Sequence, residues 1–90
     1  MKNQYVYMLR CADGSFYTGW TTDLNKRIET HNSGKGAKYT RSRRPVELIY
    51  HEVYQDKLKA QGREREIKKM TRAEKEKLVS LSAEDPAAVL

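Results

Sequence analysis

The sequence has little cysteine and no long hydrophobic run, and each shortage excludes a class of protein. Cys11 is the only cysteine among 90 residues, which excludes an intramolecular disulfide and a zinc site built from several thiolates. No apolar run approaches the roughly 18 residues that a membrane-spanning helix needs. The N-terminal residues also lack the small-residue cleavage site of a signal peptide. We therefore expect a protein of the reducing cytoplasm that has no membrane partner.

Acidic residues are also few, with 12 Asp plus Glu against 18 Lys plus Arg and a formal net charge of +6. This excess favours a polyanionic partner, most simply nucleic acid, and no protein partner is evident. Hydrophobic residues make up 38% of the chain, enough for one modest core. The length predicts a single domain over residues 4–80, followed by a flexible tail over residues 81–90.

Residues 4–11 and 15–21 are rich in aromatic and β-branched residues, so each segment is predicted to form a strand. The Ala-Asp-Gly segment between them indicates a turn, and the length of that turn decides which side chains share a face. A two-residue loop places Tyr7 and Tyr17 on opposite faces of the hairpin. A three-residue loop, with Gly14 in the left-handed conformation, places them on the same face. The sequence leaves both registers open, and Gly14 permits the second.

The rest of the chain is predicted to alternate helices with one more strand. The expected elements are a helix from Leu24 to about Asn32 capped near Asp23, a loop over 34–44, a strand over 46–54, a helix capped by Asp56, and a last helix from the capping box Thr71-Arg72-Ala73-Glu74 to about Ser80.

Tyr7 and Tyr17 are the first candidates for chemistry. They can simply cover the core of the hairpin, or they can hold and polarise a water molecule. Gly19 favours the second interpretation, because glycine inside a strand often marks the close approach of a ligand or of another backbone. Gly62, inside a predicted helix, similarly suggests tight contact, with the sheet as the candidate neighbour.

Arg27 and His31 lie four residues apart and share a helical face. They can be a snorkelling arginine and a histidine that makes one hydrogen bond, or a phosphate-binding guanidinium beside an imidazole that moves a proton. Glu64 stands four residues after Ala60 and three before Ile67, so it leans towards the buried side of its helix. It can be an ion-pair partner or a carboxylate that holds Mg²⁺.

The segment from Lys35 to Arg44 carries five basic residues and no acid. Such a run is usually solvated, but here the cations are interleaved with Gly, Ser, Thr and Tyr, which can contact phosphate, ribose or base faces. We therefore expect part of this segment to bind substrate, with these side chains: Lys35, Lys38, Arg41 and Arg43.

In this order, the signals resemble the GIY-YIG nuclease family, and within it the short single-domain bacterial members. The resemblance covers about residues 4–80. It rests on the tripeptides Tyr-Val-Tyr (5–7) and Tyr-Thr-Gly (17–19), on Arg27, His31 and Glu64, and on the segments 31–40 and 67–76. Tyr5 stands where the family's first tripeptide has glycine, and Thr18 replaces isoleucine in the second. The asparagine that follows the glutamate in homing-endonuclease members is missing.

The resemblance implies an α+β fold in which helices flank a three-stranded antiparallel sheet, in the order β-β-α-β-α-α. It also implies phosphodiester hydrolysis of nucleic acid with Mg²⁺ or Mn²⁺, and we expect DNA to be favoured over RNA. The implied catalytic residues are Tyr7, Tyr17, Arg27 and His31, with Gly19 among the substrate-binding residues and Glu64 as the metal ligand.

In the implied reaction, Tyr7 takes a proton from the attacking water, as phenolate or through His31. A phenol with an ordinary pKa near 10 is a poor base at neutral pH, so its neighbours must assist it. The rival hypothesis is a nucleic-acid-binding module that keeps this scaffold without cleavage, and the lack of a recognisable DNA-targeting domain favours it.

Overall fold

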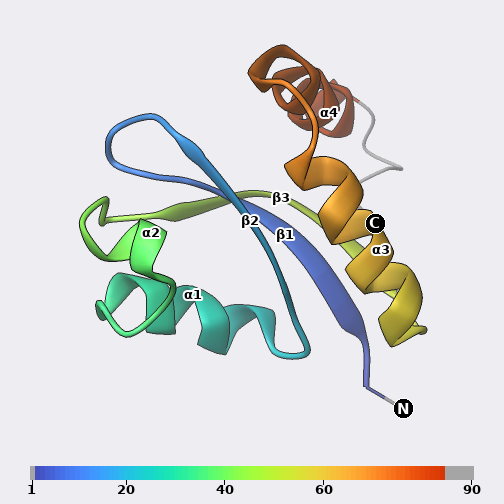
Figure 1. The fold of residues 1–90 in the computed structure, drawn as a ribbon, viewed down its shortest axis with the longest axis horizontal. Helices are drawn as coiled ribbons and strands as arrows, with labels where there is room; N and C mark the ends of the chain where they lie inside the picture. Colours follow the sequence, from blue (N-terminus) through green and yellow to red (C-terminus); the bar gives the residue numbers. More distant parts are fainter. Residues whose placement is uncertain (1, 85–90) are drawn as a thin grey trace.

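The computed structural model describes residues 2–84, which form an α+β fold (Figure 1). The elements, in chain order, are β1 (Gln4–Arg10), β2 (Phe16–Thr21), α1 (Leu24–Asn32), α2 (Lys38–Arg41), β3 (Glu47–Tyr54), α3 (Lys57–Lys68) and α4 (Arg72–Glu84). The strands form one antiparallel sheet in the order β2-β1-β3. The predicted three-stranded sheet flanked by helices is confirmed. No helix in the described residues is both long and apolar enough to cross a membrane.

The turn between β1 and β2 has the three-residue form. Gly14 has a φ of 84°, a conformation that glycine adopts without steric cost. Tyr7 pairs with Gly19, and Leu9 pairs with Tyr17. Because successive side chains of a strand point to opposite faces, this register places Tyr7 and Tyr17 on the same face of the sheet.

The central strand β1 divides its side chains between two small cores. The buried residues of one core, on the side of α3, are Val6, Met8, Ala60 and Ile67. The buried residues of the other are Tyr7, Leu9, Cys11 and Val46, and Leu24 and Ile28 of α1 pack against them. Consequently α1 and α2 lie on one side of the sheet, and α3 and α4 lie on the other (Figure 1).

The predicted helix starts are confirmed by their hydrogen bonds. Asp23 and Asp56 each accept a backbone N–H from the first turn of the helix that follows. The capping box before α4 is reciprocal. The Thr71 N–H donates to Glu74 Oε1 at 3.0 Å, and the Glu74 N–H donates to Thr71 Oγ1 at 3.2 Å. These local signals act within one helical turn, which is why the sequence alone reveals them.

One segment predicted as a loop contains a helical turn. Residues 38–41 form α2, and Thr40 within it is fully buried. The composition of the segment is typical of a loop, but contacts with α1 favour the helical turn. This turn adds an element to the predicted order.

The last helix ends later than predicted. Helix α4 continues to Glu84, beyond its predicted end at about Ser80, because residues 81–84 contain no glycine or proline that would end it. Residues 85–90, most of the predicted tail, lie outside the described residues.

Gly62 does not make the tight contact with the sheet that its place in a helix suggests. A Cβ at this position would have the Arg65 Nη2 atom, 3.9 Å away, as its nearest neighbour. An alanine would therefore fit at position 62 without displacing any neighbour.

Candidate active site

Tyr7 and Tyr17 lie beside each other on the face of the sheet that α1 covers, with ring centroids 6.5 Å apart. Gly19 provides the space for the Tyr7 ring, since a Cβ there would lie 2.4 Å from the Tyr7 hydroxyl oxygen. The close approach that Gly19 was expected to mark is therefore the approach of the Tyr7 phenol. Its predicted contact with substrate stays a prediction.

His31 connects Tyr7 to α2 through both of its ring nitrogens. The Nε2 atom lies 2.9 Å from the Tyr7 hydroxyl oxygen, and the Nδ1 atom lies 2.8 Å from Thr40 Oγ1. His31 is 1% exposed and Thr40 is 0% exposed. Side chains from β1, α1 and α2 thus form one buried chain of hydrogen bonds, which we call the Tyr7–His31–Thr40 chain. Thr40 was missed in the sequence because its segment was interpreted as a loop.

A second glycine allows this chain to close. A Cβ at Gly36 would lie 2.4 Å from His31 Nδ1 and 2.9 Å from His31 Cα. The backbone before α2 therefore lies directly against the histidine. Gly19 lies against the Tyr7 phenol and Gly36 lies against His31, and both positions require a residue without a side chain.

Burial determines the protonation states of the pair. Burial, followed by the neighbouring Tyr17, raises the pKa of Tyr7, while Arg27 acts in the opposite direction and Glu64 adds a smaller rise. Burial, followed by the charge of Arg27, lowers the pKa of His31. At neutral pH both side chains are therefore uncharged, and they share a single hydrogen bond.

Arg27 lies at the solvent edge of the same helical face that carries His31 inward. It is exposed, and it lines a surface cleft together with Lys2, Lys26 and Thr30. Its charge acts on the pKa values of both Tyr7 and His31. Arg27 can therefore contact an anion from solvent while it remains electrostatically coupled to the buried pair.

Glu64 projects from α3 and is largely buried, as its position in the helix predicts. Its side chain is 20% exposed, and its Oε2 atom lies 3.1 Å from Lys68 Nζ. The Glu64 charge also contributes to the raised pKa of Tyr7.

The donors around Glu64 fit a metal ion of one type. Among residues 2–84, no group of three or more His, Cys, Asp or Glu side chains converges on a common point. A single carboxylate suits Mg²⁺, which keeps several waters and takes further oxygen ligands from a substrate phosphate. Lys68 is half exposed, so it can move away from the carboxylate when a cation binds.

Arg43, which was expected to bind substrate, is engaged within the protein. Its Nε donates to Asp13 Oδ2 at 3.0 Å, its Nη1 donates to the Tyr39 carbonyl at 2.8 Å, and its guanidinium lies 4.0 Å from the centre of the Tyr39 ring. Tyr39 in turn stacks on Tyr17 at 5.9 Å, and Tyr17 meets His31 edge-on at 5.3 Å. Arg43 therefore supports an aromatic stack that ends at the histidine.

The other three cations of this segment that were expected to bind substrate face solvent. Lys35, Lys38 and Arg41 are all exposed, and within residues 2–84 none of them has a salt-bridge partner. Arg41 is partly constrained, because its Nε donates to the Gly36 carbonyl at 3.3 Å. The segment thus presents three cations close to the buried chain.

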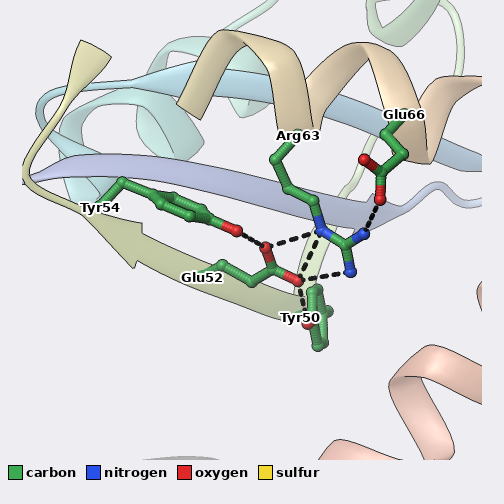
Figure 2. Close-up of polar contacts among 5 residues, drawn as sticks. All are labelled: Tyr50, Glu52, Tyr54, Arg63 and Glu66. Atoms are coloured by element: carbon green, nitrogen blue, oxygen red, sulfur yellow. Dashed lines mark hydrogen bonds and ion pairs between the residues drawn. The ribbon is translucent and has the colours of Figure 1, made fainter. Parts of the chain in front are cut away.

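A second polar cluster lies between β3 and α3 (Figure 2). Arg63 Nε donates to both Glu52 carboxylate oxygens, at 2.9 and 3.1 Å, and Nη2 donates to Oε2 at 3.0 Å. The hydroxyls of Tyr50 and Tyr54 also donate to Glu52, and Glu66 pairs with Arg63. Burial opposes ionisation of Glu52, but these hydrogen bonds keep its pKa below the ordinary value. The available sequence signal was a carboxylate between two tyrosines at i−2 and i+2, which share one face of a strand.

Comparisons with known proteins indicate one family. A sequence model described as the GIY-YIG catalytic domain matches residues 3–77. The chain is 58% identical to the UPF0213 protein CPE1444 of Clostridium perfringens over 76 residues. These residues make up 84% of this chain and 82% of that protein. The solution NMR structure of the UPF0213 protein BH0048 from Bacillus halodurans is similar with a TM-score of 0.59 and 53% identity, over 88% of this chain and 84% of that one. That of the protein EF2693 from E. faecalis is similar with a TM-score of 0.65 and 41% identity, over 94% and 91% of the two chains.

Proposed function

The chain belongs to the GIY-YIG family, and from this premise we propose that it is a metal-dependent nuclease that hydrolyses phosphodiester bonds, with DNA as its main substrate. The observation that supports this proposal best is the buried hydrogen bond between Tyr7 and His31. The opposite charges of Arg27 and Glu64 both act on the same phenol.

Proton transfer is the part of the reaction assigned to Tyr7 and His31. As the oxygen of an attacking water bonds to phosphorus and the bond to the leaving oxygen breaks, the water proton passes to the Tyr7 oxygen. The phenol proton passes at the same time to His31 Nε2, 2.9 Å away. This relay avoids a preformed phenolate, which the raised pKa of Tyr7 disfavours. The lowered pKa of His31 keeps the imidazole free to accept the proton.

Charge stabilisation is the part assigned to Arg27, Glu64 and the cation. Arg27 binds the phosphoryl group and neutralises the charge that grows on its oxygens. Glu64 would hold the divalent cation, in place of its contact with Lys68. When bound, the cation supplies Lewis-acid stabilisation of the phosphate and of the leaving oxygen. Tyr17, beside Tyr7, orients the attacking water.

Substrate binding is assigned to the exposed cations near α2. Lys35, Lys38 and Arg41 contact the phosphate backbone, whereas Arg43 supports the aromatic stack. On duplex DNA, Lys38→Ala should reduce the slope of log affinity against log salt by about one unit. Lys77→Ala, which removes an exposed cation from α4 on the other side of the sheet, is the matched control.

The decisive experiment measures cleavage by the purified chain with Mg²⁺ or Mn²⁺, and with a chelator, on single-stranded, duplex and branched DNA and on RNA. Tyr7→Phe and Glu64→Gln should each reduce the rate by about 100-fold or more. Glu66→Gln, a carboxylate two residues along the same helix and 65% exposed in its side chain, should cleave at nearly the wild-type rate. Cleavage that survives Glu64→Gln would contradict the metal-ligand assignment.

The alternative function is a nucleic-acid-binding module that does not cleave. The observation that favours it is the single carboxylate, since the described residues form no larger group of metal ligands around it. This alternative predicts salt-dependent binding of nucleic acid that Glu64→Gln leaves unchanged, without cleavage of any substrate in the presence of either metal.

A further inference from the structure

Thr40 is the innermost member of the Tyr7–His31–Thr40 chain. It is completely buried and comes from α2, an element of four residues. Its hydroxyl lies 2.8 Å from His31 Nδ1 and 2.9 Å from the carbonyl oxygen of Ala37. A buried hydroxyl between a ring nitrogen and a carbonyl affects the position of the protons along the whole chain.

The number of protons available limits these hydrogen bonds to two arrangements, and in the first the Thr40 hydroxyl donates to the Ala37 carbonyl, as its distance of 2.9 Å allows. A threonine hydroxyl carries one proton, and a carbonyl oxygen can only accept. When Thr40 donates to the Ala37 carbonyl, its oxygen must accept from His31, so the imidazole proton lies on Nδ1. A neutral imidazole has only one N–H, so Nε2 then carries a lone pair. That lone pair faces Tyr7, whose hydroxyl donates to it.

The reversed arrangement would have a different chemical capacity. If Thr40 donated to Nδ1, the imidazole proton would lie on Nε2 and would point at the Tyr7 oxygen. His31 could then accept no proton from Tyr7 without first losing one. The same heavy-atom positions therefore permit proton transfer from Tyr7 to His31 in the first arrangement and block it in the second. The two arrangements differ in the group to which the Thr40 hydroxyl donates.

The surroundings of Thr40 keep its hydroxyl in place. Gly36 lies against His31, where a Cβ would be 2.4 Å from Nδ1. At the other end of α2, the Arg43 N–H donates to the Thr40 carbonyl at 3.1 Å, and the Arg43 side chain is tied to Asp13 in the β1–β2 turn. The hydroxyl is therefore held between the ring and the Ala37 carbonyl.

We infer that Thr40 is a positioning residue whose hydroxyl holds His31 in the Nδ1–H tautomer, so that Nε2 stays free to take the Tyr7 proton. The inference rests on the proposed function for its effect on cleavage, whereas the tautomer can be observed without any activity. Thr40 touches neither the substrate nor the reacting atoms and acts only through His31.

The test uses the ¹⁵N-labelled full chain and a long-range ¹H–¹⁵N correlation spectrum of the histidine rings at about pH 7.5, where burial keeps His31 neutral. The chain has two histidines, and the exposed His51 serves as an internal reference. We expect the wild type to carry the His31 proton on Nδ1. Thr40→Val, which removes the hydroxyl at nearly constant volume, should shift population to the Nε2–H form, and Thr40→Ser should restore the wild-type spectrum.

Cleavage provides the second measurement. Thr40→Val should lower kcat by about 100-fold with little change in KM, because the base is lost while the phosphate contacts remain. Thr40→Ser should recover most of that loss.

A wild-type His31 that carries its proton on Nε2 would overturn the inference, and so would a folded Thr40→Val protein whose tautomer is unchanged. The wild-type spectrum is a test by itself even if Thr40→Val fails to fold. An Nδ1–H wild type that responds to Thr40→Val but cleaves no substrate would support the tautomer assignment and reject the proposed nuclease.

Discussion

The two faces of the sheet bury their polar groups in different ways. On the side of α1, the Tyr7–His31–Thr40 chain is uncharged, and each hydrogen bond joins one atom to the next. On the side of α3, Glu52 and Arg63 are charged, and the carboxylate receives hydrogen bonds from the guanidinium and from two phenols (Figure 2). The first arrangement is linear, whereas in the second several donors converge on one carboxylate.

The difference indicates what each region contributes. The Glu52–Arg63 cluster, in which the carboxylate is fully hydrogen-bonded, attaches α3 to β3. Replacing either residue should be destabilising, because the remaining charge is poorly solvated. A line of neutral bonds can redistribute its protons without creating a buried charge. We therefore expect changes in the Glu52–Arg63 cluster to act mainly on stability and changes in the Tyr7–His31–Thr40 chain to act mainly on cleavage.

The largest effect on stability should come from Arg63→Ala. It leaves Glu52, which is 16% exposed in its side chain, with only two phenol donors, and should cost about 3 kcal/mol of unfolding free energy in urea titrations. Arg10→Ala breaks a pair whose side chains are 53% and 59% exposed and should cost less than about 0.5 kcal/mol. Equal losses in the two variants would show that the buried cluster is no stronger than a surface pair.

Gly36→Ala should have the next largest effect. Its new Cβ would meet both the ring and the backbone of His31, and such overpacking typically costs about 1–3 kcal/mol. Because the displaced group is the central histidine of the Tyr7–His31–Thr40 chain, the cleavage rate should fall even at temperatures where the variant is fully folded. Thermal unfolding and single-turnover cleavage together measure both effects. A stable and active Gly36→Ala would mean that the approach to His31 is looser than the structure indicates.

As the pH falls, the Tyr7–His31–Thr40 chain should lose its contribution to stability before the Glu52–Arg63 cluster does. The folded pKa of His31 lies below its ordinary value of about 6.5, so the unfolded chain binds the proton more readily. This contribution to stability is complete above the unfolded pKa and is lost as the pH falls towards the folded pKa. The Glu52–Arg63 cluster keeps its contribution to stability down to a lower pH, because the pKa of Glu52 is depressed from a value that is already acidic.

The measurement is the free energy of unfolding between about pH 7 and pH 5. In His31→Gln, the free energy of unfolding should fall less steeply on acidification than in the wild type. His51→Gln, which removes an exposed imidazole, is the matched control. An unchanged slope in His31→Gln would show that the buried imidazole does not titrate differently on folding.

The smallest effect has the opposite sign. Gly62→Ala, one residue before Arg63, places a methyl group where no atom lies closer than 3.9 Å. Replacing glycine by alanine inside a helix should raise the unfolding free energy by about 0.5–1 kcal/mol. The contrast with Gly36→Ala separates a glycine required by packing from one that is not, and a destabilised Gly62→Ala would remove that distinction.

Features that depend only on neighbours in the chain could be predicted from the sequence. Gly14 permits the observed hairpin turn without deciding between the two possible registers, and the caps at Asp23 and Asp56 start their helices. The inward lean of Glu64 follows from helical periodicity. Each of these signals acts over a few residues, so the printed sequence contains it in full.

Which distant groups meet depends on the packing of the helices and strands. The hydroxyl of Thr40 reaches His31 because a segment with the composition of a loop folds into a helical turn against α1. Arg43 pairs with Asp13, 30 positions away, instead of facing solvent. Glu52 meets Arg63 because α3 crosses β3 at that point. The partner of each of these polar groups is set by how the helices and strands pack against one another, which no local pattern encodes.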